Sequence, residues 1–374
     1  MIDLKDYGYT HFFDIEGSDM TELIPARITE VHREIYKIVS QYGESSARLK
    51  GSMLIDVEST VNFPAVGDFI WIKYNEQGDS TIIKVLDRES KFSRPNYSGH
   101  GVGYVKRILE QVVAANFDYV FIMISLNNDL NINRLQRYLT VAWQSGGIPV
   151  VVLTKTDLVE DYTEQFKLVQ KEAVGVDVVA VSAVTGFGLD KLTDYMKPRK
   201  TLVFLGSSGV GKSSLVNALA GEDIMNVNTI REDDSKGRHT TTHRQLILLK
   251  SGTMIIDTPG MRELGMWDIS EGLGEAFSDI EELFTRCKFT NCTHSNEPNC
   301  AVLKAIEIGT LEHSRWDTYM QLKREAKFTD NRAVYLREKN TFFKKLNKDM
   351  KVKNKNDNKK IKSNKMEGNN SENN

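Results

Sequence analysis

The sequence predicts three folded domains: an N-terminal OB-type β-barrel, a central α/β domain and a C-terminal helical domain. Short segments of alternating apolar and polar residues between positions 26 and 90 indicate the barrel. Strands and helices alternate regularly from residue 117 onward, which favours a parallel sheet covered on both faces. Three cysteines and a histidine gather between positions 287 and 300 and mark the third domain.

The domain boundaries follow from changes in composition. We expect an N-terminal extension at 1–25, the barrel at 26–90, a linker at 91–116, the α/β domain at 117–268, the helical domain at 269–343 and a basic low-complexity tail at 344–374. The linker is expected because its sequence is rich in Gly, Ser and basic residues. The tail holds ten Lys against four acidic residues. Such a tail either contacts a polyanion or is a solvated, disordered appendage.

The overall composition is that of an ordinary globular protein, with 40% hydrophobic and 27% charged residues among 374. No run of about eighteen apolar residues occurs. The first twenty residues carry acids instead of a basic, apolar leader. These features predict a cytoplasmic protein without membrane contact. Three clustered cysteines, an odd number, argue against a disulfide framework.

A phosphate-binding loop is predicted at TLVFLGSSGVGKSSLVNALAG, residues 201–221. GSSGVGKS fits the pattern G-x-x-x-x-G-K-[ST] between an apolar strand and a helix. Its backbone N–H groups would face phosphates, Lys212 would reach the β- and γ-phosphates, and the Ser213 hydroxyl would bind Mg²⁺. A simple Gly-rich turn would not require Lys-Ser at this spacing. We expect the nucleotide to contact Gly206, Ser207, Ser208, Gly209, Val210, Gly211, Lys212, Ser213 and Ser214.

Two further segments indicate guanine as the base. Thr154-Lys155-Thr156-Asp157 resembles the N/T-K-x-D motif, in which the Asp accepts hydrogen bonds from guanine N1–H and the exocyclic amine. The Lys155 stem would pack along the base. Thr154 stands where Asn is commoner, which predicts a somewhat weaker base contact. Ser182-Ala183 resembles the loop whose backbone N–H meets the guanine oxygen. TKTD alone would equally fit a helix-capping Asp, but the three segments together predict GTP.

A polar run at residues 228–244, NTIREDDSKGRHTTTHR, predicts a mobile switch. One hydroxyl among Thr240, Thr241 and Thr242 would complete the coordination of Mg²⁺, unless the run is simply a Thr-rich disordered loop. The strand that follows ends in DTPG. Asp257 suits a position that holds Mg²⁺ through water, and the Gly260 N–H suits the γ-phosphate.

The order of these motifs is unusual. TKTD and SA precede the P-loop, the Thr run and DTPG, whereas ordinary GTPases begin with the P-loop. The 117–268 domain is therefore predicted to be circularly permuted, which a packed sheet tolerates when its original termini lie close together.

The cysteine cluster predicts a closed zinc site. Cys287, Cys292, His294 and Cys300 offer three thiolates and an imidazole, the ligand set of a tetrahedral structural site for one Zn²⁺. Chance clustering of three free thiols is the alternative. Residues 301–328 have apolar residues at helical spacing, so this segment is predicted to be helical.

Taken together, the chain resembles the ribosome small-subunit-dependent GTPase A family, circularly permuted GTPases that act in 30S maturation. The resemblance lies in TKTDL, VSAVTGFGLDKL, GSSGVGKSSLVNAL, GRHTTTH, IIDTPGMRELG and C-x₄-C-x-H-x₅-CAV, and needs neither the N-terminal extension nor the tail. It implies an OB–GTPase–zinc architecture, binding to the 30S subunit through its rRNA, and GTP hydrolysis to GDP stimulated by that subunit. We expect the protein to act as a monomer. Two alternatives are a GTP-binding assembly scaffold with little turnover and an ATP-using P-loop enzyme, which TKTD disfavours.

The group that orients the attacking water is not where many GTPases place it. They carry Gln directly after D-x-x-G, but this chain carries Met261, which has no group to hold water. His239 is the catalytic candidate because it lies in the predicted switch and exchanges a proton near neutral pH. His243, a lysine, or an rRNA group supplied in trans are the alternatives. His239 would otherwise contact RNA or cap the loop.

Overall fold

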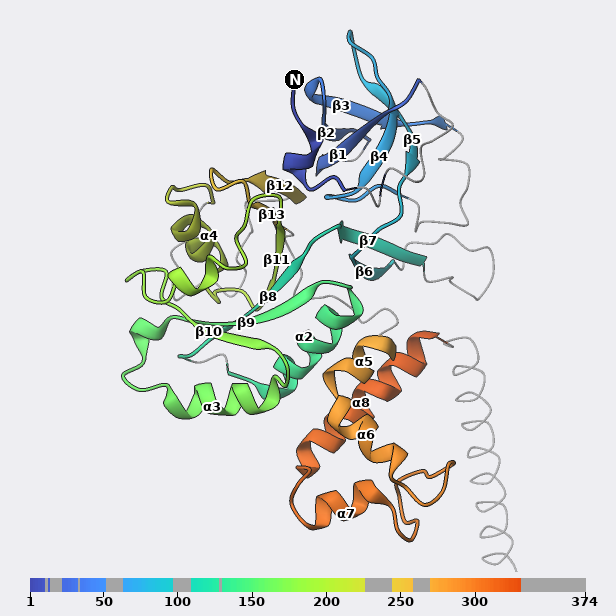
Figure 1. The fold of residues 1–374 in the computed structure, drawn as a ribbon, viewed down its shortest axis with the longest axis vertical. Helices are drawn as coiled ribbons and strands as arrows, with labels where there is room; N and C mark the ends of the chain where they lie inside the picture. Colours follow the sequence, from blue (N-terminus) through green and yellow to red (C-terminus); the bar gives the residue numbers. More distant parts are fainter. Residues whose placement is uncertain are drawn as a thin grey trace, which may run out of the picture. The chain divides into compact units, whose positions relative to one another are not determined.

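The computed structural model describes residues 1–10, 13, 22–32, 34–51, 63–96, 109–127, 130–225, 244–257 and 270–330. The chain divides into two compact units, residues 1–326 and 327–374, and nearly all described elements belong to the first (Figure 1). Within the described ranges, no helix is both long enough and apolar enough to cross a membrane.

The predicted N-terminal barrel is confirmed. Its five strands are β1 (Ile24–Val31), β2 (Tyr36–Ser40), β3 (Gly43–Leu49), β4 (Phe69–Lys73) and β5 (Ser80–Val85). The sheet closes on itself, because β1 pairs with β2, β2 with β3, β3 with β5, β5 with β4, and β4 again with β1. Side chains that alternate along these strands fill the interior, among them Ile28, Ile38 and Ile72, which are fully buried.

The predicted α/β domain is also present, with a sheet in the order β10-β9-β8-β11-β13-β12. Its strands are β8 (Tyr119–Ser125), β9 (Ile148–Thr154), β10 (Asp177–Ala180), β11 (Thr201–Gly206), β12 (Arg244–Leu248) and β13 (Met254–Asp257). All are parallel except β12, which runs antiparallel to β13. Helices α2 (Ile132–Gln144) and α3 (Thr163–Glu172) pack on one face, and α4 (Lys212–Ala220) packs on the other.

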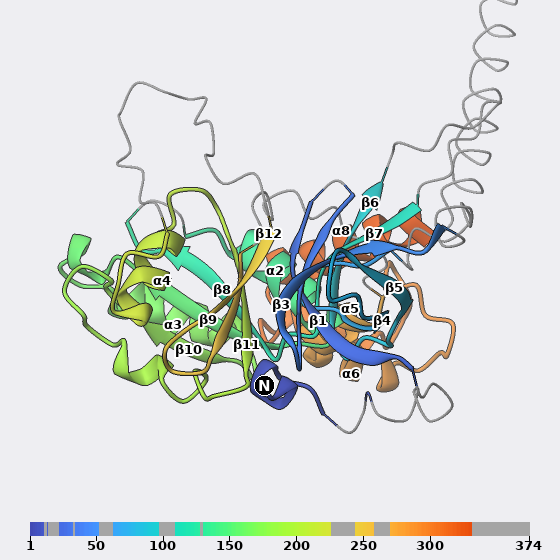
Figure 2. The ribbon, with the colours of Figure 1, turned by 90° about the horizontal axis from the view of Figure 1, so that it is seen from above.

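The barrel and the α/β domain share one continuous sheet of eleven strands. β1 pairs antiparallel with β12, with Glu30 opposite Gln245 and Val31 opposite Arg244 (Figure 2). Without this pairing, β12 would expose an unpaired edge. The pairing joins residues more than two hundred positions apart, so no local sequence pattern predicts it.

A buried arginine reinforces this junction. The Arg27 side chain, on β1, is 1% exposed. Its guanidinium donates hydrogen bonds to the Tyr7 carbonyl at 2.5 Å, the Asn116 carbonyl at 2.7 Å, the Gly67 carbonyl at 3.1 Å and the Thr201 hydroxyl at 3.1 Å. Burial lowers the pKa of Arg27 to about 10, which leaves the group charged at neutral pH. Arg27 thus connects the barrel, the N-terminal turn and the strand leading to the P-loop.

One segment differs from the sequence expectation. The stretch 91–116, predicted as a linker, contains β6 (Lys91–Asn96) and β7 (Leu109–Ala115), an antiparallel pair. Composition missed them because Gly, Ser and basic residues dominate positions 97–108, which lie outside the described residues. The N-terminal extension contains the 3₁₀ turn η1 (Leu4–Tyr7), which buries Leu4 and Tyr7.

The C-terminal part is helical, as predicted. It comprises α5 (Ser270–Ala276), α6 (Ser278–Thr285), α7 (Ala301–Glu307) and α8 (His313–Asp330), with a core of its own that includes Phe277, Val302 and Tyr319. The segment 301–328, predicted to be helical, contains α7 and most of α8. Gly309 adopts φ 77°, a left-handed conformation that ends a helix, and α7 stops before it.

Candidate nucleotide and metal sites

The fold brings the predicted nucleotide-binding segments to one edge of the sheet. β8, β9, β10, β11 and β13 are parallel, so their carboxyl ends lie at the same side. TKTD begins at the last residue of β9, Ser182 follows β10, the P-loop follows β11, and Asp257 ends β13.

The P-loop backbone needs its glycines for two different reasons. Gly209 and Gly211 have φ of 74° and 101°, in the left-handed region where a side chain would be strained. At Gly206, an added Cβ would lie 2.9 Å from the Met123 carbonyl oxygen, so only glycine permits this approach of β11 to β8. α4 begins immediately afterwards at Lys212, so its first N–H groups point toward the loop, as a phosphate site requires.

The side chains of Lys212 and Asp257 contact each other in the predicted nucleotide site. The Lys212 ammonium forms an ion pair with the Asp257 carboxylate, which is 3% exposed. These are the two groups expected to meet the phosphates and the Mg²⁺ that accompanies them. The ion pair shows that the end of β13 and the start of α4 bring these two charged groups into contact.

The guanine segments are linked by hydrogen bonds. The Ser182 hydroxyl, which is buried, donates to Asp157 Oδ1 at 2.5 Å and accepts from the Thr185 N–H at 3.1 Å. Asp157 itself is exposed, so its carboxylate stays accessible to a base. Ser182 therefore orients the Asp157 carboxylate, a role that the sequence pattern did not reveal. Lys155 has φ 62°, a left-handed conformation between the end of β9 and the 3₁₀ turn Thr156–Leu158.

Thr154 connects the base segment to the phosphate segment. Its buried hydroxyl donates to the Val210 carbonyl in the P-loop at 2.6 Å. An added Cβ at Gly211 would lie 4.0 Å from Lys155 Cε, so the loop and the lysine stem are also close. The segment predicted to bind the base and the segment predicted to bind the phosphates are thus adjacent in space.

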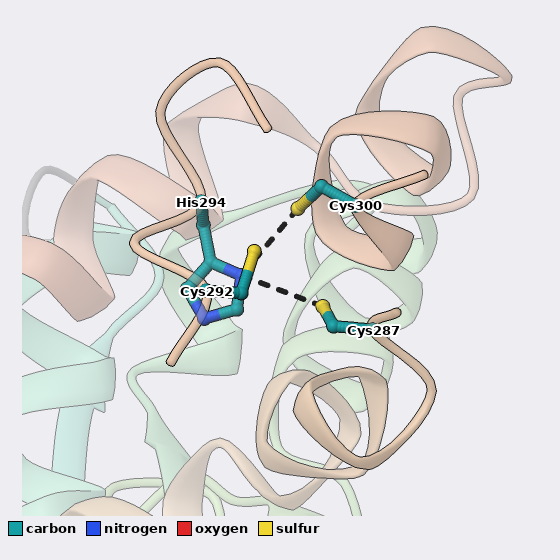
Figure 3. A group of neighbouring side chains, drawn as sticks. All are labelled: Cys287, Cys292, His294 and Cys300. Atoms are coloured by element: carbon teal, nitrogen blue, oxygen red, sulfur yellow. Dashed lines mark hydrogen bonds between the residues drawn. The ribbon is translucent and has the colours of Figure 1, made fainter. Parts of the chain in front are cut away.

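The cysteine cluster forms a compact ligand set (Figure 3). The ligand atoms of Cys287, Cys292, His294 and Cys300 all lie within 4.8 Å of one another. His294 Nδ1 lies 3.6 Å from Cys287 Sγ and 3.4 Å from Cys300 Sγ. Zinc bonds of about 2.3 Å to sulfur and about 2.0 Å to nitrogen place S and N roughly 3.5 Å apart in a tetrahedral site. The side chains present therefore fit zinc.

The surroundings hold this ligand set in place. The Phe284 ring stacks on the His294 imidazole at 4.3 Å between centroids. Burial, aided by the charge of Lys323, lowers the pKa of His294, which favours the neutral imidazole that binds metal. The Glu297 carboxylate accepts from the Thr293 N–H at 2.8 Å and the Ser295 N–H at 3.0 Å, which fixes the loop between the ligands.

Comparison with known proteins identifies the family to which the chain belongs. Residues 85–267 match the family described as RsgA GTPase. A small ribosomal subunit biogenesis GTPase, RsgA 2, of Listeria monocytogenes serotype 4b (strain F2365) is 46% identical over 322 residues, covering 86% of this chain and 89% of the relative. The chain belongs to the RsgA GTPase family. RsgA 2 of Lactiplantibacillus plantarum (strain ATCC BAA-793 / NCIMB 8826 / WCFS1) is 42% identical over 327 residues, covering 87% and 90%.

Two solved structures of the RsgA type share this fold. YjeQ from Thermotoga maritima superposes with a TM-score of 0.61 at 26% identity, covering 81% of this chain and 98% of that one. YloQ, a circularly permuted GTPase, gives 0.56 at 25% identity, with 83% and 97% covered. The protein is thus a GTP hydrolase with a circularly permuted GTPase domain, as the order of its motifs predicts.

Several predicted site residues of this RsgA-type chain lie outside the described residues. These are His239, Thr240, Thr241, Thr242 and Gly260, together with His243 and Met261. The expected catalytic role of His239 and the choice of switch Thr therefore stay predictions. Arg244, the first described residue after the Thr run, begins β12.

Proposed function

We propose that this GTPase binds the small ribosomal subunit through rRNA and couples GTP hydrolysis, stimulated by that subunit, to late 30S maturation. The names of its relatives, small ribosomal subunit biogenesis GTPases, support the partner. The observation that carries the proposal is the convergence of TKTD, SA, the P-loop and Asp257 at one sheet edge, in permuted order. The closed barrel and the Cys₃His loop supply the surfaces that would meet RNA.

Within this proposal each segment has one task. Asp157, oriented by Ser182, recognises guanine, and the Lys155 stem packs along the base. The P-loop N–H groups and Lys212 hold the β- and γ-phosphates, and the Gly260 N–H bonds the γ-phosphate. Ser213, Asp257 and one of Thr240, Thr241 and Thr242 hold the Mg²⁺ that accompanies GTP. His239 orients or deprotonates the attacking water once the subunit orders the switch.

We further propose that the Cys₃His set holds one structural Zn²⁺. The metal would join the end of α6 to the start of α7, because Cys287 and Cys300 flank the loop and Cys292 and His294 lie within it. We also propose the domain boundaries expected from the sequence, with the GTPase domain at 117–268 and the zinc domain at 269–343, because these boundaries separate the GTP site from the zinc site. The protein would act as a cytoplasmic monomer that exchanges GTP and GDP.

Steady-state GTP hydrolysis in the presence of purified 30S, 50S and 70S particles tests the proposal. We expect the 30S subunit to stimulate turnover well beyond the 50S subunit, because recognition is assigned to small-subunit rRNA. Equal stimulation by 30S and 50S particles would contradict the assigned partner. No stimulation by any particle would favour a GTP-binding scaffold.

A further inference from the structure

An acidic residue, Glu297, lies in the loop that carries the Cys292, His294 and Cys300 ligands. In this position an acid is a candidate ligand, since zinc also binds carboxylates. The compact ligand set that the described residues form comprises only the three cysteines and His294. The hydrogen bonds of the Glu297 carboxylate show what the acid does instead.

Both oxygens of the Glu297 carboxylate accept hydrogen bonds from the same loop. Oε1 accepts from the Thr293 N–H at 2.8 Å and from the Thr293 hydroxyl. Oε2 accepts from the Ser295 N–H at 3.0 Å and from the Asn296 N–H at 3.1 Å. An ionised carboxylate has about four lone-pair sites, and these hydrogen bonds occupy them. Glu297 is therefore an acceptor for the loop backbone and not a metal ligand.

These hydrogen bonds hold the residues on both sides of His294. Thr293 precedes the ligand and Ser295 follows it. His294 has φ 58°, in the left-handed region that residues other than glycine rarely adopt. In this conformation its Nδ1 lies 3.6 Å from Cys287 Sγ and 3.4 Å from Cys300 Sγ (Figure 3). Fixing both neighbours therefore keeps the imidazole where a metal would need it.

The loop contains a second left-handed residue next to a ligand. Asn299, with φ 61°, directly precedes Cys300. Asn tolerates this conformation better than most residues, but a free chain still rarely adopts it. A loop without the Glu297 hydrogen bonds would have to order this backbone at the moment of metal binding, which weakens the binding.

We infer that Glu297 is a positioning residue of the zinc site, whose carboxylate holds the ligand loop in its metal-binding shape and thereby raises the affinity for Zn²⁺. The inference rests on the proposed zinc site. Groups that orient metal ligands without touching the metal typically change metal affinity by about 10–100-fold when they are removed.

The test compares Glu297→Ala and Glu297→Gln with Glu307→Gln in the full-length protein. Ala removes the acceptor, whereas Gln keeps the size of the side chain but turns an amide N–H₂ toward N–H groups of the loop. Glu307, an exposed acid at the end of α7, is the matched control. Zinc affinity is measured by competition with a chromogenic chelator. We expect both Glu297 variants to bind Zn²⁺ about tenfold or more weakly than the wild type, and the control to stay within about twofold.

Substitution of Co²⁺ for Zn²⁺ separates positioning from ligation. The visible spectrum of protein-bound Co²⁺ reports the thiolate ligands and the tetrahedral geometry of the site. At saturating metal, Glu297→Ala should give the wild-type spectrum, because all four ligands are still present. Cys292→Ser, which removes a thiolate, should change the spectrum.

The inference is overturned if the Glu297 variants hold Zn²⁺ as tightly as Glu307→Gln does. It is also overturned if Glu297→Ala at saturating Co²⁺ loses the wild-type spectrum, because Glu297 would then be a ligand or a requirement for the site to form at all. A wild-type protein that binds neither Zn²⁺ nor Co²⁺ would instead overturn the proposed zinc site.

Discussion

The Thr154 hydroxyl joins the two halves of the nucleotide site. It is buried and donates to the Val210 carbonyl of the P-loop at 2.6 Å. From the sequence, Thr in place of the commoner Asn predicts a weaker base contact. The structure gives Thr154 a different task, which is to fix the base-recognising segment against the phosphate-binding loop.

Replacing Thr154 with Ala should weaken the binding of GTP and GDP alike. The Val210 carbonyl would lose a buried donor, which costs about 1–3 kcal/mol. Titration with both nucleotides measures the effect, and Thr154→Ser, which keeps the hydroxyl, is the control. Equal affinities of the Ala and Ser variants would show that the hydrogen bond does not organise the site.

Asp157→Asn tests the base specificity. The substitution exchanges an acceptor for a donor opposite the guanine amine, so GTP affinity should fall by about two orders of magnitude while xanthosine triphosphate becomes a ligand. Glu160→Gln, an exposed neighbouring acid, should leave both affinities unchanged. A variant at Asp157 that keeps wild-type GTP affinity and rejects xanthosine triphosphate would disprove the TKTD assignment.

His239→Ala tests the missing water-orienting group. If His239 positions or deprotonates the water, subunit-stimulated turnover should collapse while GTP affinity and subunit binding survive. The three quantities are measured separately, with His243→Ala in parallel. Stimulated turnover within about twofold of wild type corresponds to a change in the activation barrier well under about 1 kcal/mol. This result would show that His239 takes no part in the reaction.

At the level of elements, the Cys₃His loop connects α6 to α7 and shares a core with α8. The Phe284 and Trp316 rings pack against the His294 imidazole, and the Tyr319 ring packs against both of these rings. Metal binding at such a site contributes folding energy directly, because the ligands have no fixed arrangement in the unfolded chain.

Cys292→Ser should therefore abolish stoichiometric zinc and lower the stability of the helical domain. Elemental analysis of freshly purified protein measures the metal content, and hydrogen exchange of the backbone amides in α6 and α7 measures the local unfolding. Ser295→Ala, in the same loop but not a ligand, should retain one zinc per chain. Absence of zinc from the metal-replete wild type would contradict the assignment.

Short-range patterns explain what could be predicted from the sequence, and long-range contacts explain what could not. The P-loop, TKTD and the cysteine cluster each depend on spacing within a few residues. β6 and β7 were missed because the run rich in Gly, Ser and basic residues between them made the whole segment resemble a linker. The β1–β12 pairing and the buried Arg27 depend on contacts between distant segments, which leave no local signal.

At the level of the whole molecule, Arg27 and the β1–β12 pairing connect the barrel to the GTPase sheet. Arg27 contacts residues from four segments, and three of its acceptors are backbone carbonyls. A nucleotide-dependent change near Asp257 and the proposed RNA contact on the barrel would therefore both act on these shared contacts.

Arg27→Met should destabilise this framework by about 3 kcal/mol or more, because several buried acceptors lose their donor at once. Denaturant unfolding measures the loss, with Arg48→Met at an exposed barrel position as the control. Subunit-stimulated turnover should fall further than turnover without subunits, since the barrel would be less firmly joined to the GTPase sheet. An equal loss of turnover with and without subunits would show that Arg27 contributes only to stability.

The most direct test of the central claim is single-turnover hydrolysis of protein-bound GTP with and without saturating, purified small subunits. Single turnover removes nucleotide exchange from the measured rate, so any difference reports the cleavage step. We expect the subunit to accelerate cleavage by at least about tenfold, or about 1.4 kcal/mol of the barrier. The same slow rate with and without subunits, despite tight subunit binding, would contradict the account and identify the protein as a GTP-binding scaffold.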